Sequence, residues 1–215
     1  MESHKSPPKA TEHNVLKGKA YDARSQKAVL AQSFPSDIEA LVSGGVPEDR
    51  TLEYKLTLPG NSADDKKEFL ADISSFANAG GGDLVYGVEE DRDPGGKPTG
   101  LPKSAPGINT ANAGADVIRL ENIVRDSIEP RLVYHAAVVQ GFANGPVLVL
   151  RVAKSWAAPH MLKGSPRFFS RTSAGKYPLD VNEIRAAFAL SEALPEKLNR
   201  FRNERIARIV AEKRL

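Results

Sequence analysis

The alternation of apolar and polar residues predicts two strands in the first half of the chain. Over residues 51–56, Leu52, Tyr54 and Leu56 alternate with polar or charged residues, which predicts a strand whose three apolar side chains face a core. Residues 84–88 form a short apolar run between glycines and acidic residues, which is typical of a fully buried strand.

Apolar residues at helical spacing predict helices around these strands. A short helix is expected over residues 36–44. A capping signal at Ser62 begins a longer helix that runs to Asn78. A further helix over residues 117–128 ends before Pro130, because the residue preceding a proline resists helical geometry.

The second half of the chain is richer in β-forming residues. Residues 132–139 and 147–152 predict a hairpin with a wide turn, and residues 167–171 predict one more strand. Residues 91–114 are rich in glycine, proline and small residues, which predicts a long surface loop.

Composition divides the chain into three parts. Residues 1–34 lack both the strand and the helix period, which predicts a basic N-terminal arm. Residues 35–194 hold the predicted strands and helices, including a helix that opens at Asp180. Pro195 is expected to separate that helix from a basic C-terminal helix over residues 195–215.

The length and composition exclude several classes of protein. A chain of 215 residues can bury one full core but hardly two. No apolar run approaches the roughly 18 residues that span a membrane, and the N-terminus lacks the apolar stretch of a secretory signal. We therefore expect a cytoplasmic protein with no membrane partner. The absence of cysteine excludes a disulfide, a thiolate zinc site and a thiol nucleophile.

The net charge of +3 hides an uneven distribution. Residues 35–95 carry fourteen acidic and five basic side chains, whereas residues 151–176 carry six basic side chains and no acidic one. This division is compatible with two solvated faces, or with a protein that holds a cation on one side and a polyanion on the other.

Acidic residues lie near the ends of the two predicted strands. Glu48 precedes the first strand, Glu53 lies on its polar face, and Glu89 and Glu90 follow the second. If these strands are neighbours, about 4.8 Å apart, their carboxylates can meet around a divalent cation. Lys55 shares the face of Glu53 and is suited to stabilising charge on a phosphate. The alternatives are a solvated strand end and a surface salt bridge between Lys55 and Glu53.

A basic segment follows the predicted hairpin. Its cationic side chains are the candidate nucleic-acid contacts Arg151, Lys154, Lys163, Arg167, Arg171 and Lys176. Lysine and arginine neutralise backbone phosphates, and exposed aromatic rings stack on unpaired bases. The aromatic residues of the segment are Trp156, Phe168, Phe169 and Tyr177. His160 is expected at the surface. The glycines at 80–82 follow a helix rather than precede one, so we interpret them as a helix end followed by close backbone packing.

Three motifs together resemble the Schlafen-type AlbA domain family. Residues 48–55 read EDRTLEYK, residues 75–82 read SFANAGGG, and residues 84–90 read LVYGVEE. The family pattern runs from E-x4-E-aromatic-K through AFAN-x-GG to a strand that ends in GV before acidic residues. The resemblance covers about residues 46–190, and the chain is similar to a single-lobe bacterial member.

This resemblance implies an α+β domain, with a mixed β-sheet and flanking helices, that is associated with nucleic acid. In nuclease members, three acids bind a divalent metal and cleave structured RNA such as tRNA. By motif position these acids correspond to Glu48, Glu53 and Glu90, with Glu89 as the second choice for the third. That third position departs from the family by having Glu where Asp is usual. Some relatives carry two lobes, which a homodimer of this chain would supply.

We therefore expect a nucleic-acid-binding protein, and specifically a metal-dependent endoribonuclease that uses Mg²⁺ or Mn²⁺, with Lys55 assisting the three glutamates. The alternative is a non-catalytic DNA-binding regulator whose acids are structural. An ATP-binding regulator is a weaker alternative, because the sequence has no GxxxxGKS/T phosphate loop.

Overall fold

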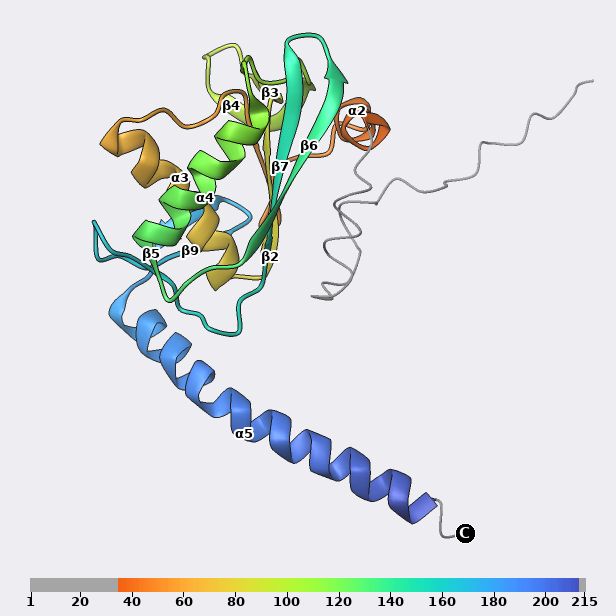
Figure 1. The fold of residues 1–215 in the computed structure, drawn as a ribbon, viewed down its shortest axis with the longest axis vertical. Coiled ribbons are helices and arrows are strands. Elements are labelled where there is room, and N and C mark those ends of the chain that lie inside the picture. The colour runs from red at the N-terminus through yellow and green to blue at the C-terminus, as the bar shows by residue number, and fades with distance from the viewer. Residues whose placement is uncertain (1–34, 213–215) are drawn as a thin grey trace, which may run out of the picture. The chain divides into compact units, whose positions relative to one another are not determined.

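The computed structural model describes residues 35–212 (Figure 1). The predicted arm, residues 1–34, lies outside the described residues, as do residues 213–215. The helices in chain order are α2 (Pro35–Ser43), α3 (Ala63–Asn78), α4 (Ala113–Ser127) and α5 (Val181–Glu212). The strands are β1 (Leu52–Lys55), β2 (Gly81–Tyr86), β3 (Glu89–Arg92), β4 (Pro98–Ser104), β5 (Ile128–Glu129), β6 (Tyr134–Phe142), β7 (Gly145–Ala153), β8 (Met161–Leu162), β9 (Phe169–Thr172) and β10 (Gly175–Pro178).

The largest sheet has the strand order β1-β2-β7-β6. Strand β1 pairs in parallel with β2, with Leu52 beside Asp83 and Lys55 beside Tyr86. The adjacency of the first two predicted strands is thus confirmed. Strands β6 and β7 are neighbours joined by a short turn, so the predicted hairpin is also confirmed, with a tighter turn than expected. Helices and mixed sheets together make the fold α+β, as predicted.

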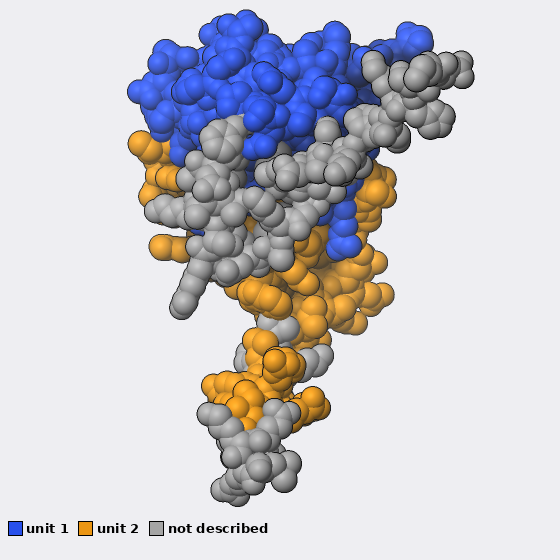
Figure 2. Space-filling view, turned by 90° about the vertical axis from the view of Figure 1, so that its right-hand side faces the viewer, with its two compact units in different colours: residues 1–58, 83–117, 134–151 blue, residues 59–82, 118–133, 152–215 orange. Residues whose placement is uncertain are grey.

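The chain divides into two compact units, coloured separately in Figure 2. The described part of the first unit comprises residues 35–58, 83–117 and 134–151. Its core packs α2 against the sheet through apolar side chains that are almost fully buried, namely Ile38, Leu41, Leu52, Tyr54, Val85, Val88, Val139, Val147 and Val149. Alternation in β1 buries Leu52 and Tyr54, whereas Leu56, which was expected to face the core, is 44% exposed just beyond the strand.

The second unit comprises residues 59–82, 118–133 and 152–212 of the described chain. Helix α3 lies against β8, β9 and β10. Ser62 caps this helix by accepting a hydrogen bond from the Asp65 N–H at 3.0 Å, as its capping signal predicts. After the helix, Gly81 has φ +80°, and a Cβ there would lie 2.7 Å from the Val152 carbonyl oxygen. Close backbone packing therefore accounts for the glycine run.

Two sequence predictions about chain organisation are wrong. Residues 91–114, which were expected to form a long loop, contain most of an antiparallel hairpin made by β3 and β4. In the turn of this hairpin the Gly96 N–H donates a hydrogen bond to the Asp93 carbonyl at 2.8 Å. Pro195 does not separate two helices, because α5 runs through it without interruption. The residues on both sides of Pro195 are mostly strong helix formers, which favours a continuous helix despite the roughly 3 kcal/mol that an interior proline costs.

None of the helices within residues 35–212 combines the length and the apolar character needed to cross a lipid bilayer.

Candidate functional site

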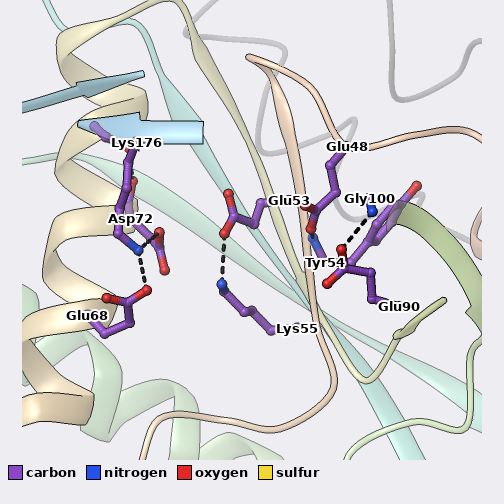
Figure 3. Close-up of polar contacts among 10 residues, drawn as sticks. Glu48, Glu53, Tyr54, Lys55, Glu68, Asp72, Glu90, Gly100 and Lys176 are labelled. Atoms are coloured by element: carbon purple, nitrogen blue, oxygen red, sulfur yellow. Dashed lines mark hydrogen bonds and ion pairs between the residues drawn. The ribbon is translucent and has the colours of Figure 1, made fainter. Parts of the chain in front are cut away.

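Two of the predicted glutamates are held by backbone groups of the first unit (Figure 3). The Glu48 Oε1 accepts a hydrogen bond from the Tyr54 N–H at 2.7 Å. The Glu90 Oε1 accepts one from the Gly100 N–H, also at 2.7 Å. In turn the Glu48 N–H donates to the Gly100 carbonyl at 2.7 Å. The loop before β1 and the hairpin β3–β4 are therefore joined at Gly100.

Gly100 allows this arrangement through its backbone conformation. Its φ is +74°, a region that side-chain-bearing residues rarely adopt, and a Cβ there would lie 3.7 Å from the Glu48 Cβ. With no side chain at this position, both backbone groups of Gly100 reach the two glutamates.

The surroundings of Glu48 disfavour the charged form of its carboxyl group. Burial raises the pKa of Glu48 to about 7, the Tyr54 N–H opposes that rise, and the carboxylates of Glu53 and Glu90 add to it. Lys55 lowers the pKa and is the smallest of these causes. The carboxyl groups of Glu53 and Glu90 therefore both lie within electrostatic range of Glu48.

Glu53 and Lys55 form an ion pair on the polar face of β1. The Lys55 Nζ lies 2.8 Å from the Glu53 Oε1, and the two side chains are 33% and 12% exposed respectively. The structure therefore realises the salt bridge that the sequence offered as the alternative to a catalytic role, and it also places an ammonium group beside the acids.

Glu89 is directed to a different set of partners. Its carboxylate binds the Lys103 Nζ at 2.8 Å and the Ser104 hydroxyl at 3.0 Å. These hydrogen bonds from Lys103 and Ser104 lower the pKa of Glu89. Glu90, rather than Glu89, is the residue that influences Glu48.

The chemistry of this group suits a hard divalent cation in charge and in donor type, because carboxylate oxygens are its preferred ligands. The pKa of Glu48 is raised mainly by burial and further by repulsion from Glu53 and Glu90, and a bound cation would oppose both effects. Even so, no group of three or more acidic or histidine side chains within residues 35–212 is close enough to hold a metal ion in the present side-chain positions. Binding would require Glu53 to turn from Lys55 toward Glu48 and Glu90.

The Glu48→Gln variant should change the pH dependence of stability. A carboxyl whose pKa is raised in the folded state contributes stability below its unfolded pKa of 4.5, and loses that contribution as pH rises through about 7. Glutamine keeps the acceptor for the Tyr54 N–H but has no charge. We expect the variant to exceed the wild type by about 1 to 3 kcal/mol at pH 8 and to match it near pH 4. Urea unfolding across pH measures this.

Glu121→Gln, at an exposed position of α4, is the matched control and should leave the pH profile unchanged. A wild type that gains stability between pH 4 and pH 8 relative to Glu48→Gln would contradict the assignment.

Two arginines of the predicted nucleic-acid-binding segment are buried, so the expectation that they contact phosphate is corrected. Arg151 donates from Nε and Nη2 to the two carboxylate oxygens of Asp83, each at 2.7 Å, and both side chains are at most 6% exposed. Arg171 is 2% exposed, with its guanidinium 3.7 Å from the ring centroid of Phe76. Both guanidinium groups therefore contact partners inside their own units.

Lys176 is occupied by carboxylates of its own unit. Its Nζ lies 2.6 Å from the Asp72 Oδ1 and also pairs with Glu68 (Figure 3). Asp72 is 1% exposed, so Lys176 neutralises a buried charge.

The remaining three cations of the segment, Lys154, Lys163 and Arg167, are exposed. Of the segment's aromatic side chains, three have internal partners: Phe169 is buried, Phe168 packs edge-on against Phe188, and the Tyr177 hydroxyl donates to Glu183. Trp156 is 67% exposed. Three cations and one aromatic ring of this segment are therefore exposed and available to contact nucleic acid.

Sequence reasoning missed a buried polar junction in the second unit. His160, expected at the surface, is fully buried, and its Nδ1 lies 2.8 Å from the Pro130 carbonyl oxygen. Burial lowers the pKa of His160, and the contact with Pro130 opposes that change. Asn78 accepts from the His160 N–H at 2.7 Å and donates to the carbonyls of His160 and Phe169 at 3.0 and 2.8 Å. The position of Asn78, a polar residue two positions before the glycine run, was the available signal.

Comparisons with known proteins identify the family. A family model described as Schlafen, AlbA_2 matches residues 48–180, which is more than half of the chain. A comparison with curated proteins found no match.

Among solved structures, the chain is similar to the DIP2311 protein from Corynebacterium diphtheriae, with 16% identity and a TM-score of 0.41, over 74% of this chain and 27% of that one. It is also similar to the N-terminal domain of a protein described as related to the ATP-dependent DNA helicase RecG, from Nitrosomonas europaea, with 19% identity and a TM-score of 0.40, over 52% of this chain and 68% of that one. The protein belongs to the Schlafen, AlbA_2 family.

Proposed function

We propose that this protein is a metal-dependent endoribonuclease that binds structured RNA, such as tRNA, and cleaves it at the carboxylates of Glu48, Glu53 and Glu90. Membership of the Schlafen, AlbA_2 family indicates a function that involves nucleic acid. The cleavage reaction, the RNA class and the requirement for Mg²⁺ or Mn²⁺ are our proposal, and the homodimer stays a prediction.

The observation that carries the proposal is the placement of Glu48 and Glu90, both bonded to the junction at Gly100, within electrostatic range of each other, with Glu53 also in range of Glu48. Glu53 and Glu90 destabilise the charge of Glu48 and so raise its pKa, and this repulsion lowers the stability of the fold. Groups of like charges are characteristic of functional sites. Structural ion-pair networks shift pKa values as well. Here, however, two of the causes are like charges rather than partners.

In this proposal the carboxylates bind the cation and Lys55 stabilises the phosphate. Backbone hydrogen bonds from Tyr54 and Gly100 hold Glu48 and Glu90 by one oxygen each. The three carboxylates would hold the cation, which when bound polarises the phosphoryl oxygen and lowers the pKa of water. Lys55, released from Glu53, would stabilise the negative charge that develops on the phosphate.

A second candidate function is a nucleic-acid-binding regulator without catalysis. One observation favours it: Glu48 and Glu90 each accept a strong backbone hydrogen bond, so both acids have a structural task. In that case the acids stabilise the junction at Gly100, and cleavage does not occur.

Incubation of the full chain with tRNA, with and without Mn²⁺, tests the proposal. We expect metal-dependent cleavage that is abolished in the double variant Glu48→Gln/Glu53→Gln, while tRNA binding in EDTA stays near the wild-type level. Mn²⁺ should also raise the melting temperature of the wild type, since a ligand that binds only the folded state stabilises it. The double variant should lose this increase.

A matched pair of variants tests which acid of β3 takes part. Glu90→Gln should abolish cleavage, whereas Glu89→Gln, whose side chain binds Lys103 and Ser104, should leave it intact. Binding of tRNA without any metal-dependent cleavage would favour the regulator. Cleavage that survives in the double variant would assign the reaction to other residues.

A further inference from the structure

Trp156 is an exposed aromatic side chain without an evident structural task. It is the only tryptophan of the chain, and 67% of it is exposed. Tryptophan offers a large apolar face, which proteins usually cover. The residue lies in the segment between β7 and β8, in the second unit.

Backbone hydrogen bonds hold the segment on both sides of Trp156. The Ser155 N–H donates to the Ala77 carbonyl at 3.1 Å, and the Ala157 N–H donates to the Ser155 Oγ at 3.1 Å. Further along, the His160 N–H donates to the Asn78 side chain at 2.7 Å. The last turn of α3 therefore anchors this segment, so Trp156 is presented on a fixed backbone.

The charge around Trp156 specifies the kind of occupant. The Lys154 Nζ lies 5.8 Å from the centroid of the Trp156 ring. Residues 152–179 contain no acidic side chain, and Lys163 and Arg167 in this stretch are exposed. A flat ring beside one cation, in a stretch of sequence that has further exposed cations and no acid, complements a ligand with a flat face and negative charge. A nucleotide with an unpaired base has both properties.

We infer that Trp156 is a stacking platform for an unpaired base of single-stranded nucleic acid, with Lys154 contacting the phosphate of the same strand. This inference rests on the proposed function, because it names the form of nucleic acid that the protein binds. In a duplex the bases are stacked on each other, so Trp156 would favour loops, bulges and single strands.

Because the chain has one tryptophan, its fluorescence reports on this position alone. The full chain is titrated in EDTA with an oligouridylate of about ten nucleotides, within the site size of single-strand binders, and with a blunt duplex of similar length. Excitation at the red edge of the absorption band avoids the tyrosines. We expect strong quenching by the single strand and little by the duplex.

Variants separate stacking from general attraction. In fluorescence anisotropy with a labelled oligouridylate, Trp156→Ala should weaken binding by roughly 5- to 150-fold, which corresponds to the loss of one base–aromatic stack. Trp156→Phe keeps a ring and should retain most of the affinity. Val133→Ala, an equally exposed apolar position of the second unit, should bind like the wild type.

The inference is overturned if the oligonucleotide binds without changing the tryptophan fluorescence, if Trp156→Ala binds as tightly as the wild type, or if duplex is preferred. Absence of oligonucleotide binding also overturns it. The binding assays contain EDTA, which prevents metal-dependent cleavage. If the oligonucleotide quenches the fluorescence there but the protein has no nuclease activity with Mn²⁺, this inference stands and only the catalytic proposal is refuted. If metal-dependent cleavage occurs and Trp156→Ala does not affect it, the catalytic proposal stands and the stacking role of Trp156 is refuted.

Discussion

Replacing Arg151 by methionine should destabilise the protein by about 3 to 5 kcal/mol at neutral pH, because it leaves a carboxylate buried without its cation. Asp83 and Arg151 form two hydrogen bonds at 2.7 Å and are both almost fully buried. Burial raises the pKa of Asp83, and Arg151 opposes that rise. Urea unfolding measures the loss.

The sign of the pH dependence gives a second readout for Arg151→Met. Without the arginine the pKa of Asp83 rises further, so the variant regains stability as pH falls and the carboxyl is protonated. Replacing both members, as Asp83→Leu with Arg151→Met, should recover much of the loss, because the pair then becomes apolar. Arg125→Met removes a surface pair with Asp126 and should cost less than about 1 kcal/mol. Equal losses for Arg151→Met and Arg125→Met would contradict the buried pair.

Asn78→Ala should destabilise the protein by about 2 to 5 kcal/mol, because it leaves three backbone groups without their partner. The Asn78 amide bonds to both backbone groups of His160 and to the Phe169 carbonyl. It therefore connects the end of α3 to β9 and to the segment before β8. Thermal or urea unfolding of the full chain gives the magnitude.

Two companion variants keep this prediction specific. Asn199→Ala, on the exposed surface of α5, should change the unfolding free energy by less than about 0.5 kcal/mol. Asn78→Asp retains the acceptor for His160 but directs a carboxylate at two carbonyl oxygens, so it should be less stable than wild type at neutral pH and improve in acid. An Asn78→Ala variant as stable as Asn199→Ala would refute the role of the amide.

The elements that the sequence predicted well are those governed by local rules. The cap at Ser62 and the alternation of Leu52 and Tyr54 involve neighbours within a few residues, and the structure reproduces both. The hairpin β3–β4 was missed, although its Asp93-Pro-Gly-Gly96 turn was visible, because the strands beside the turn have little apolar alternation.

The candidate site was predictable only in part, for reasons of distance along the chain. The prediction that the acids meet depended on the first two strands being neighbours, and the structure confirms that β1 and β2 pair in parallel. The junction of Glu48 and Glu90 at Gly100 depends on the hairpin β3–β4, which was not predicted from the sequence.

The burial of Arg151 depends on Asp83, 68 residues earlier, and counting charges gives no sign of such a partner. Arg171 likewise packs on Phe76, a contact between distant segments. Counting basic residues along the sequence therefore overestimated the number of cations that a polyanion could contact at the surface.

The division of the chain into two units, each assembled from three separate segments, has a consequence for biosynthesis. The first unit lacks its last segment until residue 151 has left the ribosome, and by then two segments of the second unit are already outside. Neither unit corresponds to a continuous fragment that can be expressed by itself, and both depend on contacts between distant parts of the chain. Folding during translation should therefore be delayed to a late stage, and nascent chains stalled before that point should be sensitive to proteases across their whole length.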